Sequence, residues 1–226
     1  MTQAIFTKAV TKDYYVGDHQ IRAVRGIDFS AQKGEFLCIS GKSGSGKSTL
    51  LNLLAGLEKP TGGEITLLDK RIDTMSETQR IRFRRSHVGF VFQSYNLLPQ
   101  YSALENVALP LAVSGIPARE RSDLAMKMLE MVGLSGHAAH MPGALSGGQQ
   151  QRASIARAII TRPDIVFADE PTGNLDTATG DEVMRLLTRI FREWNTTFLV
   201  VTHDPDMRKY TDKEIFMRDG RIVSGV

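Results

Sequence analysis

The sequence predicts an α/β fold in which helices cover both faces of a mostly parallel β-sheet. Four short runs are apolar throughout and lack the polar alternation of a strand that faces solvent on one side. They lie at residues 36–39, 88–92, 165–168 and 198–201. A glycine-rich segment directly follows the first run, as expected for a loop at the carboxyl end of a buried strand.

The N-terminal part is predicted to form a separate antiparallel β layer. Residues 5–10 and 21–29 alternate between apolar and polar side chains, as strands with one buried face do. The turn-forming pair Gly17 and Asp18 lies between them and can join them as a hairpin. After the glycine-rich segment we expect a helix over 47–57. It carries leucine on nearly all sides, as a helix buried between two layers would.

A helical insertion is expected between the second and third buried strands, because the strand signal disappears over residues 93–145. The predicted helices cover 103–113, 119–132, 149–160 and 179–194. A closing hairpin is predicted at 218–221. We interpret the chain as one domain, with a core at 1–92 and 148–226 and a helical subdomain at 93–147.

Composition and charge exclude several classes of protein. With 42% hydrophobic residues among 226, the chain can bury a substantial core, and no apolar run approaches the roughly 20 residues that cross a bilayer. Residues 1–8 lack the features of a signal peptide, so a soluble, cytosolic protein is expected. A net charge of +3 is too small to indicate binding of nucleic acid. The single cysteine, Cys38, lies in an apolar run and is expected to fill the core.

The densest group of positive charges is a run of four arginines. It consists of Arg80, Arg82, Arg84 and Arg85. Such runs are usually solvated helix faces, which is the interpretation we adopt. Contact with a membrane-side partner or with lipid headgroups is the alternative.

The glycine-rich segment has the residue pattern of a phosphate-binding loop. Its glycines allow positive backbone φ angles and let successive N–H groups approach phosphate oxygens, beside the positive end of the following helix. Lys47 can reach the β- and γ-phosphates, and Ser48 can ligate the Mg²⁺ that accompanies a nucleoside triphosphate. We therefore expect a core of the P-loop NTPase type. The predicted nucleotide-binding residues are Gly41, Lys42, Ser43, Gly44, Ser45, Gly46, Lys47, Ser48 and Thr49.

Two adjacent carboxylates end the third buried strand. Because neighbouring residues of a strand point in opposite directions, Asp169 and Glu170 can act on different atoms. We expect Asp169 to ligate Mg²⁺, and Glu170 to position and help deprotonate the attacking water. Beside a phosphate-binding loop, this pair indicates hydrolysis of the nucleotide, with Lys47 offsetting the developing charge.

A second site for an anion is predicted at the start of a later helix. Ser146 is a good helix cap, and Gly147 and Gly148 leave backbone N–H groups open before Gln149. It is unusual for one chain to have two helix N-termini that can each bind a phosphate. The second is explained if it faces a nucleotide that another copy of the molecule binds. A capped loop without a ligand is the alternative.

Taken together, these motifs closely resemble the ATP-binding subunit of ABC transporters. The resemblance rests on the glycine-rich loop and on five further features in the expected order and spacing. They are Gln93 after a strand, L-S-G-G-Q at 145–149 followed by Q-Q-R, A-D-E-P at 168–171, N-L-D at 174–176 and T-H-D at 202–204. The resemblance covers essentially the whole chain.

Three segments resemble a narrower branch of that family. They are A-D-E-P-T-G-N-L-D at 168–176, N-L-L-P at 96–99 and A-L-E-N-V at 103–107. The branch contains lipoprotein-releasing, macrolide-export, antimicrobial-peptide-resistance and cell-division ATPases. Lys42 is a local departure, since an uncharged residue is commoner there, and it leaves the glycines of the loop unaffected.

The resemblance implies roles for residues that the pattern alone leaves open. Gln93 would ligate Mg²⁺, and His203 would hydrogen-bond the γ-phosphate of ATP. Tyr14 would stack on adenine, with Tyr15 as a less favoured substitute. Asp176 would lie across a dimer interface and couple two sites. The residues expected at the γ-phosphate bound by the partner are Ser146, Gly147, Gly148 and Gln149.

The resemblance also implies partners. Two copies would close around two MgATP molecules and drive a separate integral membrane subunit of an export system, at the inner face of the cell membrane. Regulation of a cell-wall or cell-division enzyme through a membrane partner, without transport, is the open alternative. An ABC ATPase that acts on DNA or ribosomes would carry a coiled-coil insertion or tandem cassettes. A P-loop kinase is disfavoured, because residues 146–149 and His203 would have no function in it.

Apolar and aromatic residues after Gln93 suggest where the membrane subunit docks. They are Tyr95, Leu97, Leu98, Pro99 and Tyr101. We expect a short amphipathic helix of the membrane subunit to lie in a groove that they form.

Overall fold

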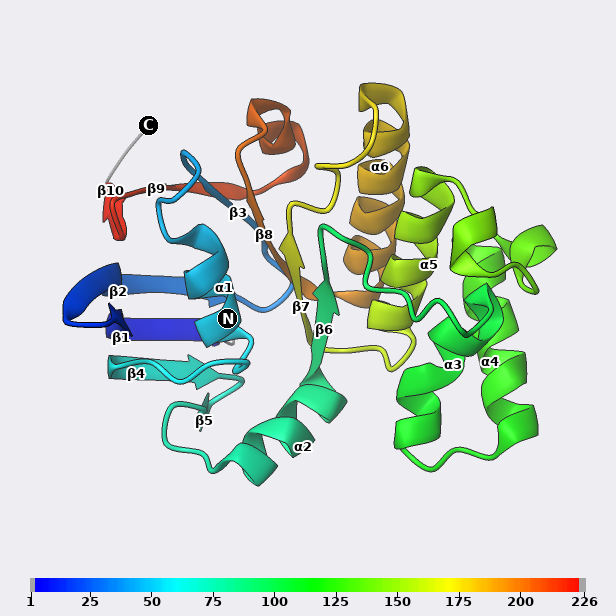
Figure 1. The fold of residues 1–226 in the computed structure, drawn as a ribbon, viewed down its shortest axis with the longest axis horizontal. Helices are drawn as coiled ribbons and strands as arrows, with labels where there is room; N and C mark the ends of the chain where they lie inside the picture. The colour runs from blue at the N-terminus through cyan, green and yellow to red at the C-terminus, as the bar shows by residue number, and fades with distance from the viewer. Residues whose placement is uncertain (1–2, 224–226) are drawn as a thin grey trace.

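The four apolar runs form four adjacent parallel strands of a six-stranded sheet in the computed structural model, which describes residues 3–223 (Figure 1). In spatial order its strands are β10 (Arg221–Val223), β9 (Lys213–Arg218), β3 (Phe36–Ser40), β8 (Thr197–Thr202), β7 (Ile165–Asp169) and β6 (Val88–Val91). The strands from β9 to β6 run parallel to their neighbours, and β10 pairs with β9 as the predicted hairpin. The predicted α/β class is confirmed.

A four-stranded antiparallel sheet forms the second layer. Its strands are, in order, β2 (His19–Gln32), β1 (Gln3–Val16), β4 (Gly62–Leu67) and β5 (Lys70–Arg71). The β1–β2 hairpin turns at Gly17 and Asp18 as predicted, whereas the sequence analysis missed β4 and β5. Helix α1 (Lys47–Leu54) packs between the two sheets, and its four leucines are fully buried. The leucines form the buried side of the helix, whereas Ser48 is exposed and Thr49 and Asn52 are half-buried, so the expectation of leucine on nearly all sides is wrong.

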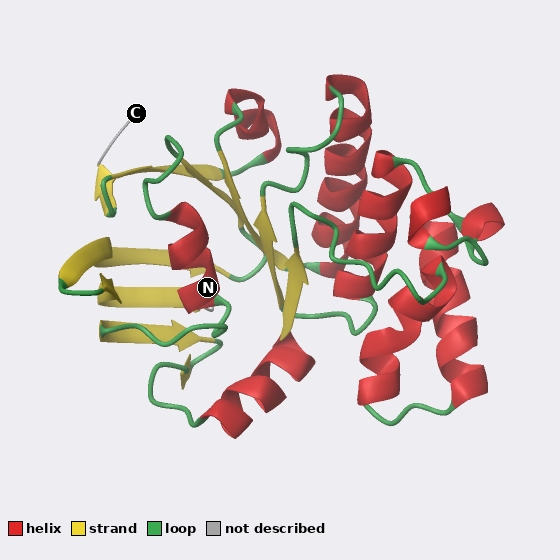
Figure 2. Cartoon of the chain, in the orientation of Figure 1, coloured by secondary structure: helices red, strands yellow, loops and turns green. Residues whose placement is uncertain are grey.

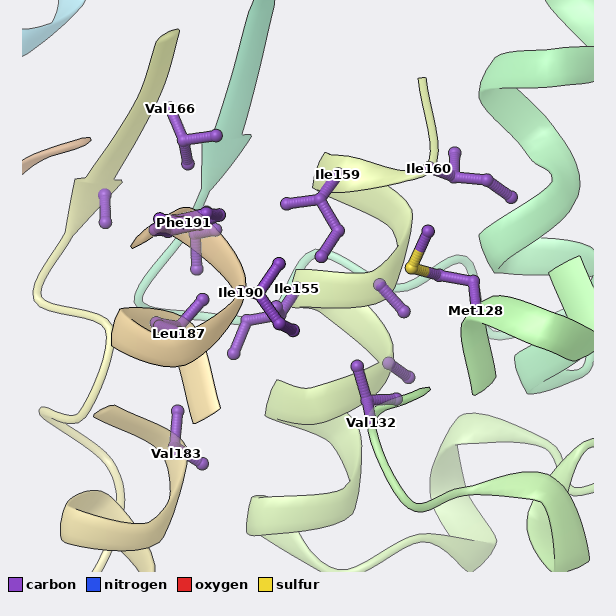
Figure 3. Close-up of a cluster of buried hydrophobic side chains, with 14 of the residues drawn as sticks. Met128, Val132, Ile155, Ile159, Ile160, Val166, Val183, Leu187, Ile190 and Phe191 are labelled. Atoms are coloured by element: carbon purple, nitrogen blue, oxygen red, sulfur yellow. The ribbon is translucent and has the colours of Figure 1, made fainter. Parts of the chain in front are cut away.

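Helices cover the other face of the central sheet (Figure 2). The helices beside the sheet are α5 (Gly147–Ile159) and α6 (Thr177–Trp194), whereas α3 (Ala103–Val113) and α4 (Ala118–Met131) pack together on the far side of α5. The short 3₁₀ turns are η1 (Ser135–His137), η2 (Pro142–Ala144) and η3 (Pro205–Tyr210). Ile155 and Ile159 of α5 face Leu187 and Ile190 of α6 in a buried cluster (Figure 3). Burying each such side chain contributes about 1.5–3 kcal/mol. Within residues 3–223, none of the helices combines the length and apolarity needed to cross a bilayer.

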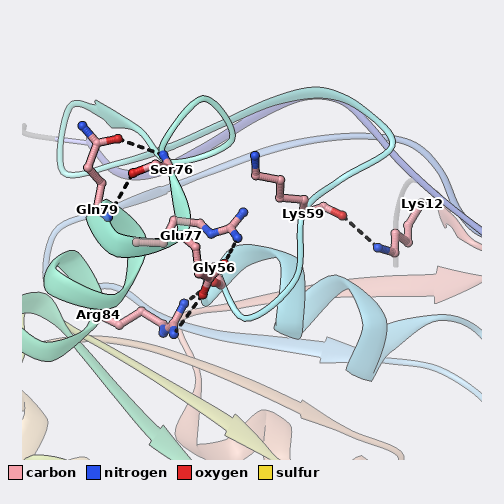
Figure 4. Close-up of polar contacts among 8 residues, drawn as sticks. Lys12, Gly56, Lys59, Ser76, Glu77, Gln79 and Arg84 are labelled. Atoms are coloured by element: carbon pink, nitrogen blue, oxygen red, sulfur yellow. Dashed lines mark hydrogen bonds and ion pairs between the residues drawn. The ribbon is translucent and has the colours of Figure 1, made fainter.

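Helix α2 (Glu77–His87) carries the arginine run, and one of these arginines is not solvated. Ser76 caps the helix through a reciprocal pair of hydrogen bonds with Gln79 (Figure 4). Arg80 is only 6% exposed, pairs with Glu77 and lies against Gly56 at the end of α1. The interpretation as a solvated face is therefore wrong for Arg80. It holds for Arg82 and Arg85, which are exposed.

The segment before α3 is fixed by Asn106, which is fully buried. The Asn106 amide donates to the carbonyls of Leu98, Tyr101 and Ser102 at 3.0, 2.9 and 3.0 Å, and its oxygen accepts from the Leu98 N–H at 2.8 Å. Leu97 packs against the buried helical cluster, and none of the five residues expected to form the docking groove lines the large apolar groove of the structure. An apolar groove of about 520 Å³ lies instead between α2, α3 and β6.

Candidate active site

The loop between β3 and α1 lines an open cleft of about 990 Å³. Gly41, Gly44 and Gly46 have φ angles of 153°, 78° and 94°, a range that favours glycine. A Cβ at Gly41 would lie 2.1 Å from the carbonyl oxygen of Met217, and one at Gly46 would lie 2.3 Å from that of Ala23. The loop therefore needs glycine for space as well as for backbone conformation.

Lys47 lies at the start of α1 and points back into the loop. Its ammonium donates to the carbonyl oxygens of Gly41 and Lys42, at 2.8 and 3.0 Å, and its side chain is buried. A buried ammonium at the positive end of a helix is a strong site for an anion. The arrangement suits the phosphate groups of a nucleotide, whose oxygens can replace or share these carbonyl partners.

Two carboxylates reach the cleft from the end of β7. Asp169 accepts a hydrogen bond from the Ser48 hydroxyl at 3.1 Å. Burial raises the pKa of the Asp169 carboxyl, and the Ser48 hydrogen bond and the Lys47 charge partly oppose that rise. Glu170 follows the end of β7 with a left-handed backbone, at φ 46°, and its carboxylate contacts His203 rather than Ser48. The two carboxylates thus have different partners, and their separate roles in the cleft stay a prediction.

Glu170 contacts the histidine that follows β8. Its Oε1 lies 2.7 Å from Nδ1 of His203, and the side chain of Glu170 is only 15% exposed. The Glu170 N–H donates to the carbonyl of Val201 at 2.9 Å, which holds the strained residue against β8. A carboxylate held by an imidazole at the edge of a cleft can orient a water molecule and take up its proton.

Gln93 follows β6 and lines the same cleft. Its carbonyl accepts a hydrogen bond from the Asn174 amide at 2.9 Å, and its own amide lies 3.1 Å from the position a Cβ would take at Gly173. The fold thus brings together residues from distant parts of the chain. They are Lys47, Ser48, Gln93, Asp169, Glu170 and His203.

The segment 146–149, which we call the signature segment, is not among the residues that line the cleft. Ser146 caps α5 through reciprocal hydrogen bonds with Gln149, so the predicted helix cap is confirmed. Asp176 similarly caps α6 by accepting from Thr179 N–H and Oγ1 at 3.0 and 2.6 Å, which lowers the pKa of Asp176. A Cβ at Gly148 would lie 2.5 Å from Cγ2 of Thr179, so the two helix starts pack together.

Comparison with known proteins decides the family of the chain. Residues 24–173 match the family model described as ABC transporter. The chain belongs to the ABC transporter family. This ABC ATPase is 43% identical over 213 residues to the lipoprotein-releasing system ATP-binding protein LolD of Legionella pneumophila (strain Paris), and the match covers 94% of each chain.

Two further relatives show how the chain relates to larger and to dimeric proteins. It is 45% identical over 217 residues to the macrolide export ATP-binding/permease protein MacB of Rhodopirellula baltica, of which it spans 32%. It superposes with a TM-score of 0.91 and 40% identity on a dimeric, post-hydrolysis ATP-binding cassette, MJ0796, bound to ADP and Pi, with 97% of each chain covered. The chain is thus an ATP-binding protein and an ATPase of the branch that the sequence resembles.

Part of the ABC ATPase's cleft comes from residues that sequence reasoning missed. They are Ile21, Arg22, Ala23, Arg25, Asp219 and Gly220. The Gly220 N–H donates to the carbonyl of Ser45 at 3.0 Å, and the Arg25 N–H donates to that of Gly220 at 2.8 Å, so the closing hairpin braces the phosphate-binding loop. No local pattern marks these residues, because tertiary packing brings them to the loop. The predicted hairpin was the one available signal.

Tyr14 does not line the cleft of the ABC ATPase. Its hydroxyl donates to the Glu58 carboxylate at 2.7 Å, and burial together with this bond raises the pKa of Tyr14. Ile21, its cross-strand neighbour on β2, lines the cleft instead. The side chain of Tyr15, the substitute, is 69% exposed. Stacking of either ring on adenine stays a prediction.

Proposed function

We propose that this ABC ATPase works as a dimer in which two copies close head to tail around two MgATP molecules and open after hydrolysis. The proposal rests on one observation: the two helix N-termini that are predicted to bind phosphate do not lie in the same cleft of one copy. The cleft contains Lys47 and Glu170, whereas the signature segment of the same copy lies outside it. ATP would bind the closed dimer through both sites and the open monomer through one, so its differential affinity favours closure. The dimeric cassette MJ0796, bound to ADP and Pi, supports the arrangement.

Three residues of the cleft, from α1 and from the ends of β6 and β7, fit a Mg²⁺ ion. The Ser48 hydroxyl and the Asp169 carboxylate lie 3.1 Å apart, and Gln93 lines the same cleft. Hydroxyl, carboxylate and amide oxygens are the hard ligands that Mg²⁺ prefers. The ion would neutralise charge on the triphosphate. A bound cation would also favour the ionised form of Asp169, whose burial without one raises its pKa.

The other groups of the cleft then have separate tasks. Glu170 accepts the proton of the attacking water, and His203 orients Glu170 and hydrogen-bonds the γ-phosphate. Lys47 and the amides of the phosphate-binding loop offset the charge that develops on the phosphoryl oxygens. The signature segment of the second copy closes the far side, where Asp176 couples the two sites.

A cysteine cross-link tests the shared site. Ser43 lies in the loop, Ser146 in the signature segment, and both are exposed. We expect copies carrying Ser43→Cys to form a disulfide with copies carrying Ser146→Cys when MgATP is present and a mild oxidant is added to accept the two electrons. The product is read as a species of doubled mass on a non-reducing gel. The native Cys38 stays inert, because burial raises the pKa of its thiol to about 12.

The control replaces Ser146→Cys by Ser114→Cys, an exposed serine at the end of α3. This pair should not cross-link under any condition. Cross-linking of the Ser43 and Ser146 variants at equal rates with and without nucleotide, or no cross-linking at all, would contradict the shared site.

The partner proposed for this dimer is an integral membrane subunit that holds the ATPase at the inner face of the membrane. The apolar groove between α2, α3 and β6 suits a short amphipathic helix of that subunit, with arginines at its rim. Its apolar lining includes Leu57, Ile81, Leu109 and Val113. Relatives that are transport ATPases support such a partner in general terms.

Charge placed in the groove should weaken this docking. Val113 is 56% exposed, so Val113→Asp is compatible with folding and is expected to reduce co-purification with the membrane subunit at least about tenfold, with basal ATPase activity unchanged. Leu124→Asp on α4, 39% exposed and outside the groove, is the matched control. Equal co-purification of both variants would place the docking surface elsewhere. The assay applies whether the partner exports a substrate or regulates an enzyme.

A further inference from the structure

A carboxylate on β9 joins two segments that lead into the active site. Oε1 of Glu214 accepts a hydrogen bond from the Ser40 hydroxyl at 2.6 Å, and Oε2 lies 2.6 Å from Nε of Arg208. Ser40 is buried, and the Glu214 side chain is only 17% exposed. Hydrogen bonds of a shielded carboxylate are among the strong ones in proteins, so both contacts are expected to persist in solution.

The first segment is the start of the phosphate-binding loop. Ser40 is the last residue of β3 and directly precedes Gly41. In the parallel ladder between β3 and β8, Ser40 lies opposite Thr202, which directly precedes His203. Ser40 and Thr202 are thus the paired last residues of β3 and β8, and the phosphate-binding loop and His203 directly follow them.

The second segment is η3, which begins two residues after His203 and contains Arg208. Its Met207 is buried in the helical core. Lys209 and Tyr210 both donate to the Asp181 carboxylate of α6 at 2.6 Å. The packing of Met207, the two hydrogen bonds to Asp181 and the pairing of Arg208 with Glu214 thus hold η3 in place, and the contact with Glu214 continues to Ser40, next to the phosphate-binding loop.

We propose that Glu214 is a positioning residue for ATP hydrolysis. It holds the phosphate-binding loop and the segment after His203 in one relative arrangement, so that His203 meets the γ-phosphate that the loop binds. The proposal rests on the function proposed above for His203. Ser40, Arg208 and Glu214 are not among the residues that line the cleft, so the effect reaches the nucleotide through the loop and His203.

The proposal predicts a defect in turnover rather than in binding. Glu214→Gln can keep the hydrogen bond from Ser40 and loses the charge that holds Arg208. We expect kcat to fall about tenfold while KM for MgATP stays within about twofold, because a misplaced group affects the chemical step more than the affinity of the loop. Arg208→Ala should have the same effect, and the double variant should be no slower than either single variant. Arg208→Lys, which keeps the ion pair, should retain most of the rate.

The decisive comparison repeats these substitutions in a His203→Ala background, with kcat and KM measured on the full chain. If Glu214 acts through His203, Glu214→Gln changes the residual kcat less than about twofold there. Glu64→Gln is the control, because Glu64 also lies on a strand and pairs with an arginine, Arg71, at 3.1 Å, away from the cleft. It should leave kcat within about twofold of the native value in both backgrounds.

Several results would overturn the proposal. They are an unchanged kcat for Glu214→Gln, an equal loss of kcat in the His203→Ala background, or a raised KM with normal kcat. If Glu214→Gln does not fold, Arg208→Ala carries the same test, since the Arg208 side chain is 57% exposed. If His203→Ala itself hydrolyses ATP at the native rate, the proposed function of His203 fails, and this proposal fails with it.

Discussion

A Glu170→Gln variant is expected to bind MgATP with native affinity and to hydrolyse it at least about 10²–10³-fold more slowly, since the amide cannot accept the proton of the attacking water. The substitution keeps the size of a side chain that is only 15% exposed and contacts His203 at 2.7 Å. Because ATP remains uncleaved, the variant should also accumulate as a closed dimer. Phosphate release under multiple-turnover conditions and nucleotide affinity by calorimetry measure the two effects separately.

Glu182→Gln is a suitable control for Glu170→Gln. Glu182 lies on α6, its side chain is 67% exposed, and it pairs with Arg152 away from the cleft. This variant should hydrolyse ATP at the native rate, because surface ion pairs contribute little. Native turnover by Glu170→Gln would remove Glu170 from the proposed mechanism.

Lys47→Ala should weaken the affinity for MgATP at least about 100-fold, in addition to any loss of stabilisation during the reaction. The variant loses the ammonium that lies among the phosphate sites. It also leaves the carbonyl oxygens of Gly41 and Lys42 without the donor that holds the loop closed. Titration calorimetry with MgATP measures the loss.

Lys33→Ala provides the comparison for Lys47→Ala. Lys33 has a side chain that is 44% exposed and pairs with Asp164 outside the cleft. Its removal should leave the affinity for MgATP unchanged. If the native protein, Lys47→Ala and Lys33→Ala bind MgATP with equal affinity, the role assigned to Lys47 and to the loop that it closes is contradicted.

Much of the fold was predictable because burial leaves a pattern in the sequence. Strands buried on both faces must be apolar throughout, and this located β3, β7 and β8. The fourth apolar run is β6, an edge strand in which Val88 and Phe90 are only half-buried. Helix α2 is polar on nearly all sides, so it lacks an apolar stripe, and the capping pair Ser76 and Gln79 was the available signal. The burial of Arg80 could not be predicted, because it depends on the end of α1 lying beside α2. Strand β4 starts with two glycines, which mask its alternation.

Some residues of the active site could likewise be predicted from the sequence, and others could not. Local motifs predicted the loop, Asp169 and Glu170, because their chemistry requires those residue types together. Gln93 and His203 came from the family resemblance, since a glutamine or a histidine after a strand carries no such signal alone. The wall formed by β2 and the closing hairpin was missed, because it depends on how the two sheets pack. The left-handed backbone of Glu170 was likewise unpredictable, because few glutamates adopt it and no local pattern marks this one.

The central claim is that ATP is held between two copies of the chain. Sedimentation equilibrium of the Glu170→Gln variant tests it most directly, with and without saturating MgATP. The claim predicts a monomer of 25.0 kDa without nucleotide and a species of twice that mass with it. It also predicts that Ser146→Arg in the same background prevents the shift while leaving nucleotide binding intact. A variant that binds MgATP and stays at 25.0 kDa would contradict the claim.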